Sequence, residues 1–97
     1  MKFRIAKLHD TLVNVVRAVG YRLIGQTPAG ELNCVRSLGA DYPRFHLYIA
    51  EHADHFIFSL HLDQKKPSYE GATAHSGDYE GELVQSEAER IKEVTAA

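Results

Sequence analysis

The chain has 97 residues, a net charge of −2 at pH 7, 44% apolar residues, 25% charged residues and one cysteine. These values suit one folded domain. They exclude an internal disulfide framework, a metal site built from cysteines, and a general electrostatic attraction to nucleic acid or an anionic membrane. The N-terminal segment lacks an apolar stretch of signal-peptide length, so we expect one cytoplasmic domain over residues 1–97.

The first periodic segment predicts a helix. Apolar residues recur at helical spacing up to Gly20, which is a stop signal, so we expect a helix over His9–Val19. Before it, Phe3 and Ile5 alternate with other residues, and this leading segment suits either a short strand or an extended arm.

Four strand-like segments follow the helix. Tyr21–Gln26 and Leu32–Leu38 flank a loop that contains Pro and Gly, which predicts a hairpin. A second hairpin joins Arg44–Ala50 to His55–Asp63, and in both of these segments large hydrophobic residues alternate with mostly polar ones.

A four-residue turn in the second hairpin sets its expected register. With Glu51–Asp54 as the loop, Leu47 lies opposite Phe58 and His46 lies opposite Ser59. The strongest hydrophobic residues of both strands then share one face of the sheet.

The C-terminal part of the chain predicts a long loop and a second helix. The loop spans about residues 63–82 and carries many Gly, Ser, Ala and Thr residues, and an apolar stripe follows over Leu83–Val94. We therefore expect a two-layer α+β fold of order α-β-β-β-β-α, in which an N-terminal and a C-terminal helix pack on one face of a four-stranded antiparallel sheet.

The polar face of the second hairpin predicts a metal site as a first hypothesis. His61 and Asp63 are two residues apart on one strand, His46 lies across from them, and His75 of the long loop could fold back over this patch. Imidazole and carboxylate ligands suit zinc or another divalent metal, and an open position on the metal could activate water. The expected ligands are His61, Asp63 and His75, with His46 as a possible fourth.

A second hypothesis uses the same patch as a metal-free pocket for a small polar or phosphorylated ligand. Lys65, Lys66 and Arg44 would hold an anion, a histidine would act as acid or base, and enzymatic turnover stays open. Asp78 belongs to the same loop. The expected ligand-binding residues are His46, Tyr48, Ser59, His61, Lys66, Tyr69 and His75.

A third hypothesis is a protein–protein interaction or homo-oligomeric assembly module without catalytic activity. The face opposite the hydrophobic residues is half apolar, which is typical of a surface that meets a partner, here as a possible homodimer through the sheet face. Nucleic acid and membranes are not expected partners. The residues that form this face are Arg22, Ile24, Asn33, Val35, Tyr48 and Ile57.

Several stretches, LGADYPRFHLYI, HLDQKKPSYEG, AHSGDYEGE and SEAERI, resemble a family of small uncharacterised bacterial proteins. The resemblance spans nearly the whole chain. It implies a free-standing cytoplasmic protein and no particular activity, because none is assigned to that family, and it assigns no catalytic residue.

Overall fold

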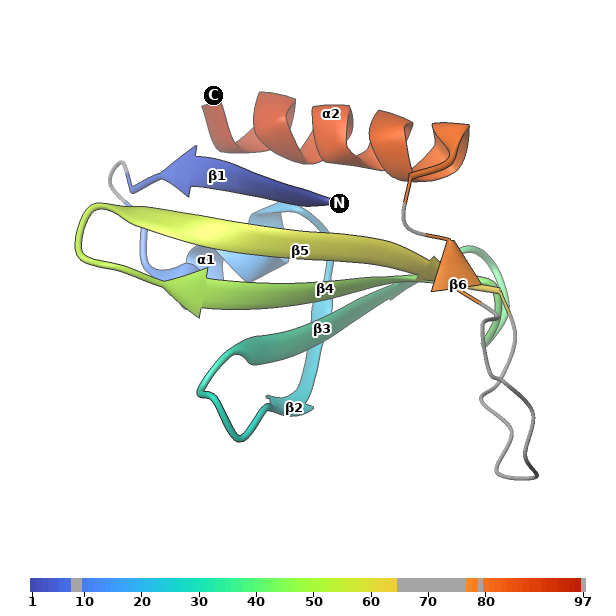
Figure 1. Ribbon diagram of the computed structural model, residues 1–97, viewed down its shortest axis with the longest axis horizontal. Helices are drawn as coiled ribbons and strands as arrows, with labels where there is room; N and C mark the ends of the chain where they lie inside the picture. The colour runs from blue at the N-terminus through green and yellow to red at the C-terminus, as the bar shows by residue number, and fades with distance from the viewer. Residues whose placement is uncertain (8–9, 65–76, 79, 97) are drawn as a thin grey trace.

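One antiparallel sheet and two helices form an α+β domain (Figure 1). The computed structural model describes residues 1–7, 10–64, 77–78 and 80–96. Along the chain the elements are β1 (Lys2–Ala6), α1 (Leu12–Ala18), β2 (Arg22–Gln26), β3 (Leu32–Ser37), β4 (Arg44–Glu51), β5 (His55–Asp63), β6 (Gly77–Asp78) and α2 (Glu82–Ala96). The strand order in the sheet is β1-β5-β4-β3-β2, and the short β6 also pairs with β5.

The first element of the chain is a strand, so the expected order α-β-β-β-β-α and the expected four-stranded sheet are wrong. β1 pairs antiparallel with β5, with Phe3 opposite Phe58 and Ile5 opposite Phe56. This alternation places both apolar side chains of β1 on the hydrophobic face, where Ile5 is buried. The leading segment is therefore a strand of the sheet and not an extended arm.

The first helix is shorter than the predicted segment His9–Val19. Thr11 is the N-cap and its hydroxyl accepts a hydrogen bond from the backbone N–H of Asn14, so the helix begins at Leu12. Residues 8–9 lie outside the described part of the chain. The predicted stop is confirmed, because Gly20 has φ 84°, a left-handed conformation that glycine adopts without strain.

The β4–β5 hairpin has the predicted faces but a register displaced by two residues. Glu51 pairs with Phe56, so Leu47 lies opposite Leu60 and His46 lies opposite His61. A shift of two residues preserves the face of every side chain, whereas a shift of one would exchange the faces. The hydrophobic pattern therefore determines which face of the sheet each side chain occupies, but it does not distinguish two registers that differ by two residues.

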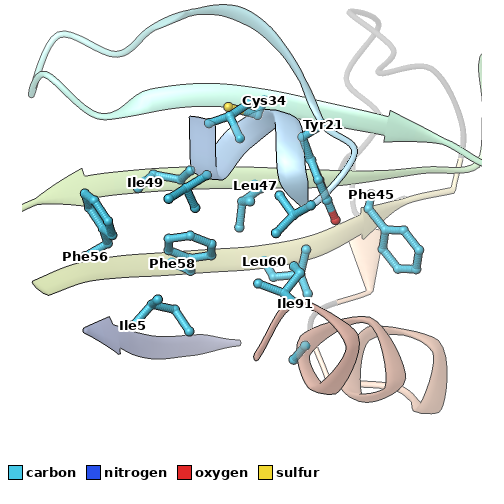
Figure 2. Close-up of a cluster of buried hydrophobic side chains, with 14 of the residues drawn as sticks. Ile5, Tyr21, Cys34, Phe45, Leu47, Ile49, Phe56, Phe58, Leu60 and Ile91 are labelled. Atoms are coloured by element: carbon cyan, nitrogen blue, oxygen red, sulfur yellow. The ribbon is translucent and has the colours of Figure 1, made fainter. Parts of the chain in front are cut away.

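The core fills the space between the sheet and the two helices (Figure 2). Phe58 and Leu60 of β5 and Leu47 of β4 are at most 1% exposed, and they belong to one buried cluster with Ile91 of α2 and Val16 of α1. The prediction that both helices cover the Phe-rich face is confirmed. None of the described helices is long and apolar enough to cross a membrane.

The C-terminal elements differ slightly from the prediction. Helix α2 begins one residue earlier than Leu83 and continues two residues beyond Val94. Within the expected loop at about 63–82, Gly77 and Asp78 form β6, which pairs with Leu62 and Asp63. Because β4 occupies one edge of β5, β1 and β6 share the other edge.

Candidate metal and ligand site

The sheet face opposite the helices carries a group of three potential metal ligands. His46 of β4 lies directly across from His61 of β5, and Asp63 follows two residues after His61 on the same side of the strand. One ligand atom from each of the three side chains can be chosen so that all lie within 4.8 Å of one another. We call these three residues the His–Asp triad, and we call the sheet face that carries them the histidine face.

Asp63 is the centre of the triad. Its Oδ2 lies 2.9 Å from Nδ1 of His46, and its Oδ1 lies 2.9 Å from Nε2 of His61. Arg44 adds a longer contact, with 3.4 Å from Nε to Oδ2. The carboxylate therefore holds the two imidazoles and one guanidinium around it, all on adjacent strands of a rigid sheet.

His46 is the most enclosed ligand of the triad, at 9% exposure. Burial lowers the pKa of its imidazole below the usual value near 6.5; the charge of Asp63 opposes this effect and the neighbouring His61 adds to it. The ring is therefore neutral at neutral pH, which is the form that binds metal ions. Its Nε2 contacts Oδ1 of Asn33 on β3.

Aromatic rings border the triad. The ring of Tyr48 stacks on that of His46, with centroids 4.6 Å apart at 30°, and the rings of His46 and His61 are 4.7 Å apart. In the neighbouring residue pair on this face of β4 and β5, Ser59 lies opposite Tyr48 and not, as the sequence predicts, opposite His46. The two-residue shift in register accounts for this correction.

A pocket of about 430 Å³ opens beside the triad, which is within the usual range for small-molecule sites. Four of the expected ligand-binding residues, His46, Tyr48, Ser59 and His61, contribute to its wall. The lining residues are Met1, Lys2, Arg44, His46, Tyr48, Ser59, Leu60, His61 and Asp63.

Five residues named as site candidates from the sequence remain. Lys65, Lys66, Tyr69 and His75 lie outside the described residues, and Asp78 is described only as a backbone partner of Leu62 in β6. Among the residues that the structure describes, the three triad ligands come from strands β4 and β5.

Sequence reasoning missed two contributors to the site, Lys2 and Asn33, and it named Arg44 as an anion-binding residue without its contact to Asp63. Lys2 reaches the pocket because β1 pairs with β5 and brings Lys2 opposite Ser59. Asn33 contacts His46 because β3 pairs with β4, and Arg44 reaches Asp63 because the register displaces their pairing by two residues. The alternation of Phe3 and Ile5 was the one sequence signal that could have identified Lys2, since it predicts the side on which Lys2 lies.

The apolar residues that the sequence places on the histidine face differ in their exposure to solvent. Val35 is on this face, opposite His46, but is only 2% exposed. Ile24 lies at a β-bulge between Leu23 and Gly25 and is 42% exposed. Of these two apolar residues, only Ile24 therefore offers exposed surface to a partner, and homodimerisation through this face stays a prediction.

No protein-family model, no curated protein and no solved structure matches this chain.

Proposed function

We propose that this protein binds a divalent metal ion, for which zinc is the best match, through His46, His61 and Asp63. The observation that carries the proposal is the closeness of the three ligand atoms, within 4.8 Å of one another on two paired strands. Two imidazoles and one carboxylate form a ligand set typical of open zinc sites, in which a fourth position takes water or another ligand. In this protein that fourth position would face the pocket.

The distances are compatible with insertion of zinc. Tetrahedral ligand atoms about 2.0–2.1 Å from zinc stand roughly 3.3–3.4 Å from one another. The two contacts between imidazole nitrogens and Asp63 are 2.9 Å long. Zinc would separate the atoms of each contact by about half an ångström and would draw together ligand atoms that lie up to 4.8 Å apart, which side-chain rotations on the two paired strands would supply.

The hydrogen-bond partners of His46 also favour a cation. Oδ1 of Asn33 can only accept a hydrogen bond, so its contact with His46 requires that the hydrogen of the neutral imidazole lies on Nε2. In the neutral ring, Nδ1 then presents a lone pair to the carboxylate of Asp63, and this contact is repulsive unless a proton or metal ion lies between the two atoms. With zinc on Nδ1, Asn33 would be the outer partner that fixes the tautomer.

The competing arrangement is a metal-free network. If the Asn33 amide is rotated, its NH₂ group donates to Nε2 and His46 donates from Nδ1 to Asp63, so that every group is satisfied without metal. A chelator distinguishes the two arrangements, because it should lower the melting temperature of the protein only if a metal ion is bound.

The test is elemental analysis of protein purified without a histidine tag, followed by zinc titration of the chelator-treated protein. We expect about one zinc per chain, and a rise in melting temperature of roughly 10 °C or more at a free zinc concentration one hundred times Kd. His61→Ala should lose the metal. His52→Ala is the matched control, because His52 lies at the exposed β4–β5 turn, where its ring stacks on His55.

The proposal is wrong if the untagged protein is metal-free, shows no saturable zinc binding and melts at the same temperature with and without chelator. Loss of stability in His61→Ala without any metal effect would instead identify the triad as a hydrogen-bond network that supports the sheet.

A further inference from the structure

The histidine face is positively charged although the whole chain is negative. Within strands β1 to β5, the charged residues of this face are four cations and one carboxylate, Asp63. The net charge of the chain is −2, so this local excess of positive charge does not follow from the overall composition. The cations are Lys2, Arg4, Arg22 and Arg44.

Two of these cations line the pocket beside the triad. Lys2 is exposed, lies opposite Ser59 in the β1–β5 pairing, and has no carboxylate partner among the described residues. Arg44 is held by its Nε contact with Asp63 at 3.4 Å and by the ring of Tyr42, 4.8 Å from its Cζ. Within the described chain, the two terminal nitrogens of Arg44 make no hydrogen bond, so their N–H donors remain unused and only Nε–H contacts Asp63.

We propose that Lys2 and Arg44 form an anion site beside the metal, and that its ligand is a small phosphate monoester whose phosphate occupies the open metal position. This inference rests on the proposed metal function for the position of the phosphate. The ammonium of Lys2 and the guanidinium of Arg44 would contact its outer oxygens, because a guanidinium matches phosphate geometry with two parallel hydrogen bonds.

Charge distinguishes a phosphate monoester from a carboxylate as the ligand. A divalent metal, Lys2 and Arg44 together supply four positive charges against the single negative charge of Asp63. A phosphate monoester carries about −1.5 to −2 at neutral pH and compensates this excess better than a carboxylate with −1. The pocket volume of about 430 Å³ leaves space for an organic group, and the rings of His46 and Tyr48 offer a planar wall for it.

The test uses protein loaded with Co²⁺, whose visible absorption bands report a new ligand on the metal. Phenyl phosphate, which joins a planar ring to a phosphate, should change these bands saturably, benzoate should bind more weakly, and phenol should have no effect. Lys2→Gln should weaken phenyl phosphate binding by roughly tenfold or more, since a charge-assisted hydrogen bond is lost, without changing the Co²⁺ affinity.

Arg4→Gln is the matched control. Arg4 lies two residues along the same strand and on the same face, but it pairs with Asp54 at 3.8 Å and does not line the pocket. A second variant, Arg44→Lys, keeps the charge and removes the planar fork, so it should also weaken phenyl phosphate binding. Arg4→Gln should bind phenyl phosphate as the unchanged protein does.

The outcomes separate this inference from the proposed metal function. If Co²⁺ binds but phenyl phosphate neither changes its bands nor binds saturably by ³¹P NMR, the anion site is overturned and the metal site stands. If Lys2→Gln and Arg4→Gln bind phenyl phosphate equally, the assignment to Lys2 is wrong. If Co²⁺ does not bind, ³¹P titration of the metal-free protein decides: binding that depends on Lys2 supports the anion site, and its absence overturns it.

Discussion

Cys34 shows how burial controls the chemistry of a single side chain. It lies on β3 opposite Leu47 of β4 and Leu23 of β2, on the face covered by the helices, and it is 0% exposed. Burial raises the pKa of its thiol to about 11, because the thiolate would lose its hydration there. The single cysteine of the chain is therefore a free thiol enclosed in the core.

The thiol of Cys34 should therefore be unreactive in the folded protein. With a pKa near 11 in place of 9.0, the thiolate fraction at pH 8 falls about a hundredfold, and the core also excludes reagents. We expect labelling by a thiol-specific disulfide reagent to be at least a hundred times slower in buffer than in denaturant. Labelling at the unfolded rate would show that the native state leaves Cys34 accessible.

At the scale of the secondary-structure elements, a buried carboxylate holds α2 against the rest of the domain. Glu87 is 4% exposed, accepts a hydrogen bond from the Tyr21 hydroxyl at 2.6 Å, and receives two from Arg90 at 2.8 Å. Arg36 of β3 adds a contact at 3.4 Å. Arg90 also donates to the carbonyl oxygen of Val19, which is the C-cap of α1. These bonds join both helices to the start of β2.

Replacing the Glu87 carboxylate should destabilise the protein substantially. Glu87→Gln leaves Arg36 and Arg90 without their counter-charge, and we expect a loss of roughly 2–4 kcal/mol, somewhat below the usual range for breaking a fully buried pair because Arg90 is one-third exposed. Glu89→Gln on the same helix is the control. Glu89 is exposed and pairs with Lys92 at 3.5 Å, so its loss should cost under about 0.5 kcal/mol.

Urea unfolding of these two variants and the unchanged protein provides the measurement. Equal midpoints for Glu87→Gln and Glu89→Gln would show that the Glu87 network contributes no more to stability than a surface ion pair.

For the whole molecule, the same network makes the free energy of unfolding fall as the pH rises above about 10. Burial, and then the hydrogen bond to Glu87, raise the pKa of Tyr21 well above its usual value of 10.0. Below pH 10, Tyr21 is protonated in both the folded and the unfolded chain, and its contribution to stability is complete. Above pH 10, only the unfolded chain releases this proton, so the folded state loses stability as the pH rises.

Tyr21→Phe should separate this effect from the titration of all other groups. At pH 8 the variant should be less stable by about 1–2 kcal/mol, since it lacks the hydrogen bond to Glu87. Between pH 8 and pH 10.5 it should lose about 1 kcal/mol less than the unchanged protein, because one titrating group is missing. Urea unfolding at both pH values tests this, and identical losses in the two proteins would contradict it.

The sequence determined the local elements and the faces of the sheet, because these depend on periodicity along the chain. Alternation in β5 places Phe56, Phe58 and Leu60 inward, and forces His61 outward with Asp63. The stripe of α2 likewise identified its buried side. Even Glu87 lies on that stripe, three residues after Val84, although its charge argues for exposure.

Tertiary structure alone decided which of these side chains meet. The pairing of β1 with β5 brought Lys2 to the pocket, and the two-residue register placed His46 across from His61. The partners of Glu87 include Tyr21 and Arg36, which are distant from it in the chain. Strand order and register are set by the packing of the whole domain, where shifts by two residues preserve every local pattern, so no local signal distinguishes them.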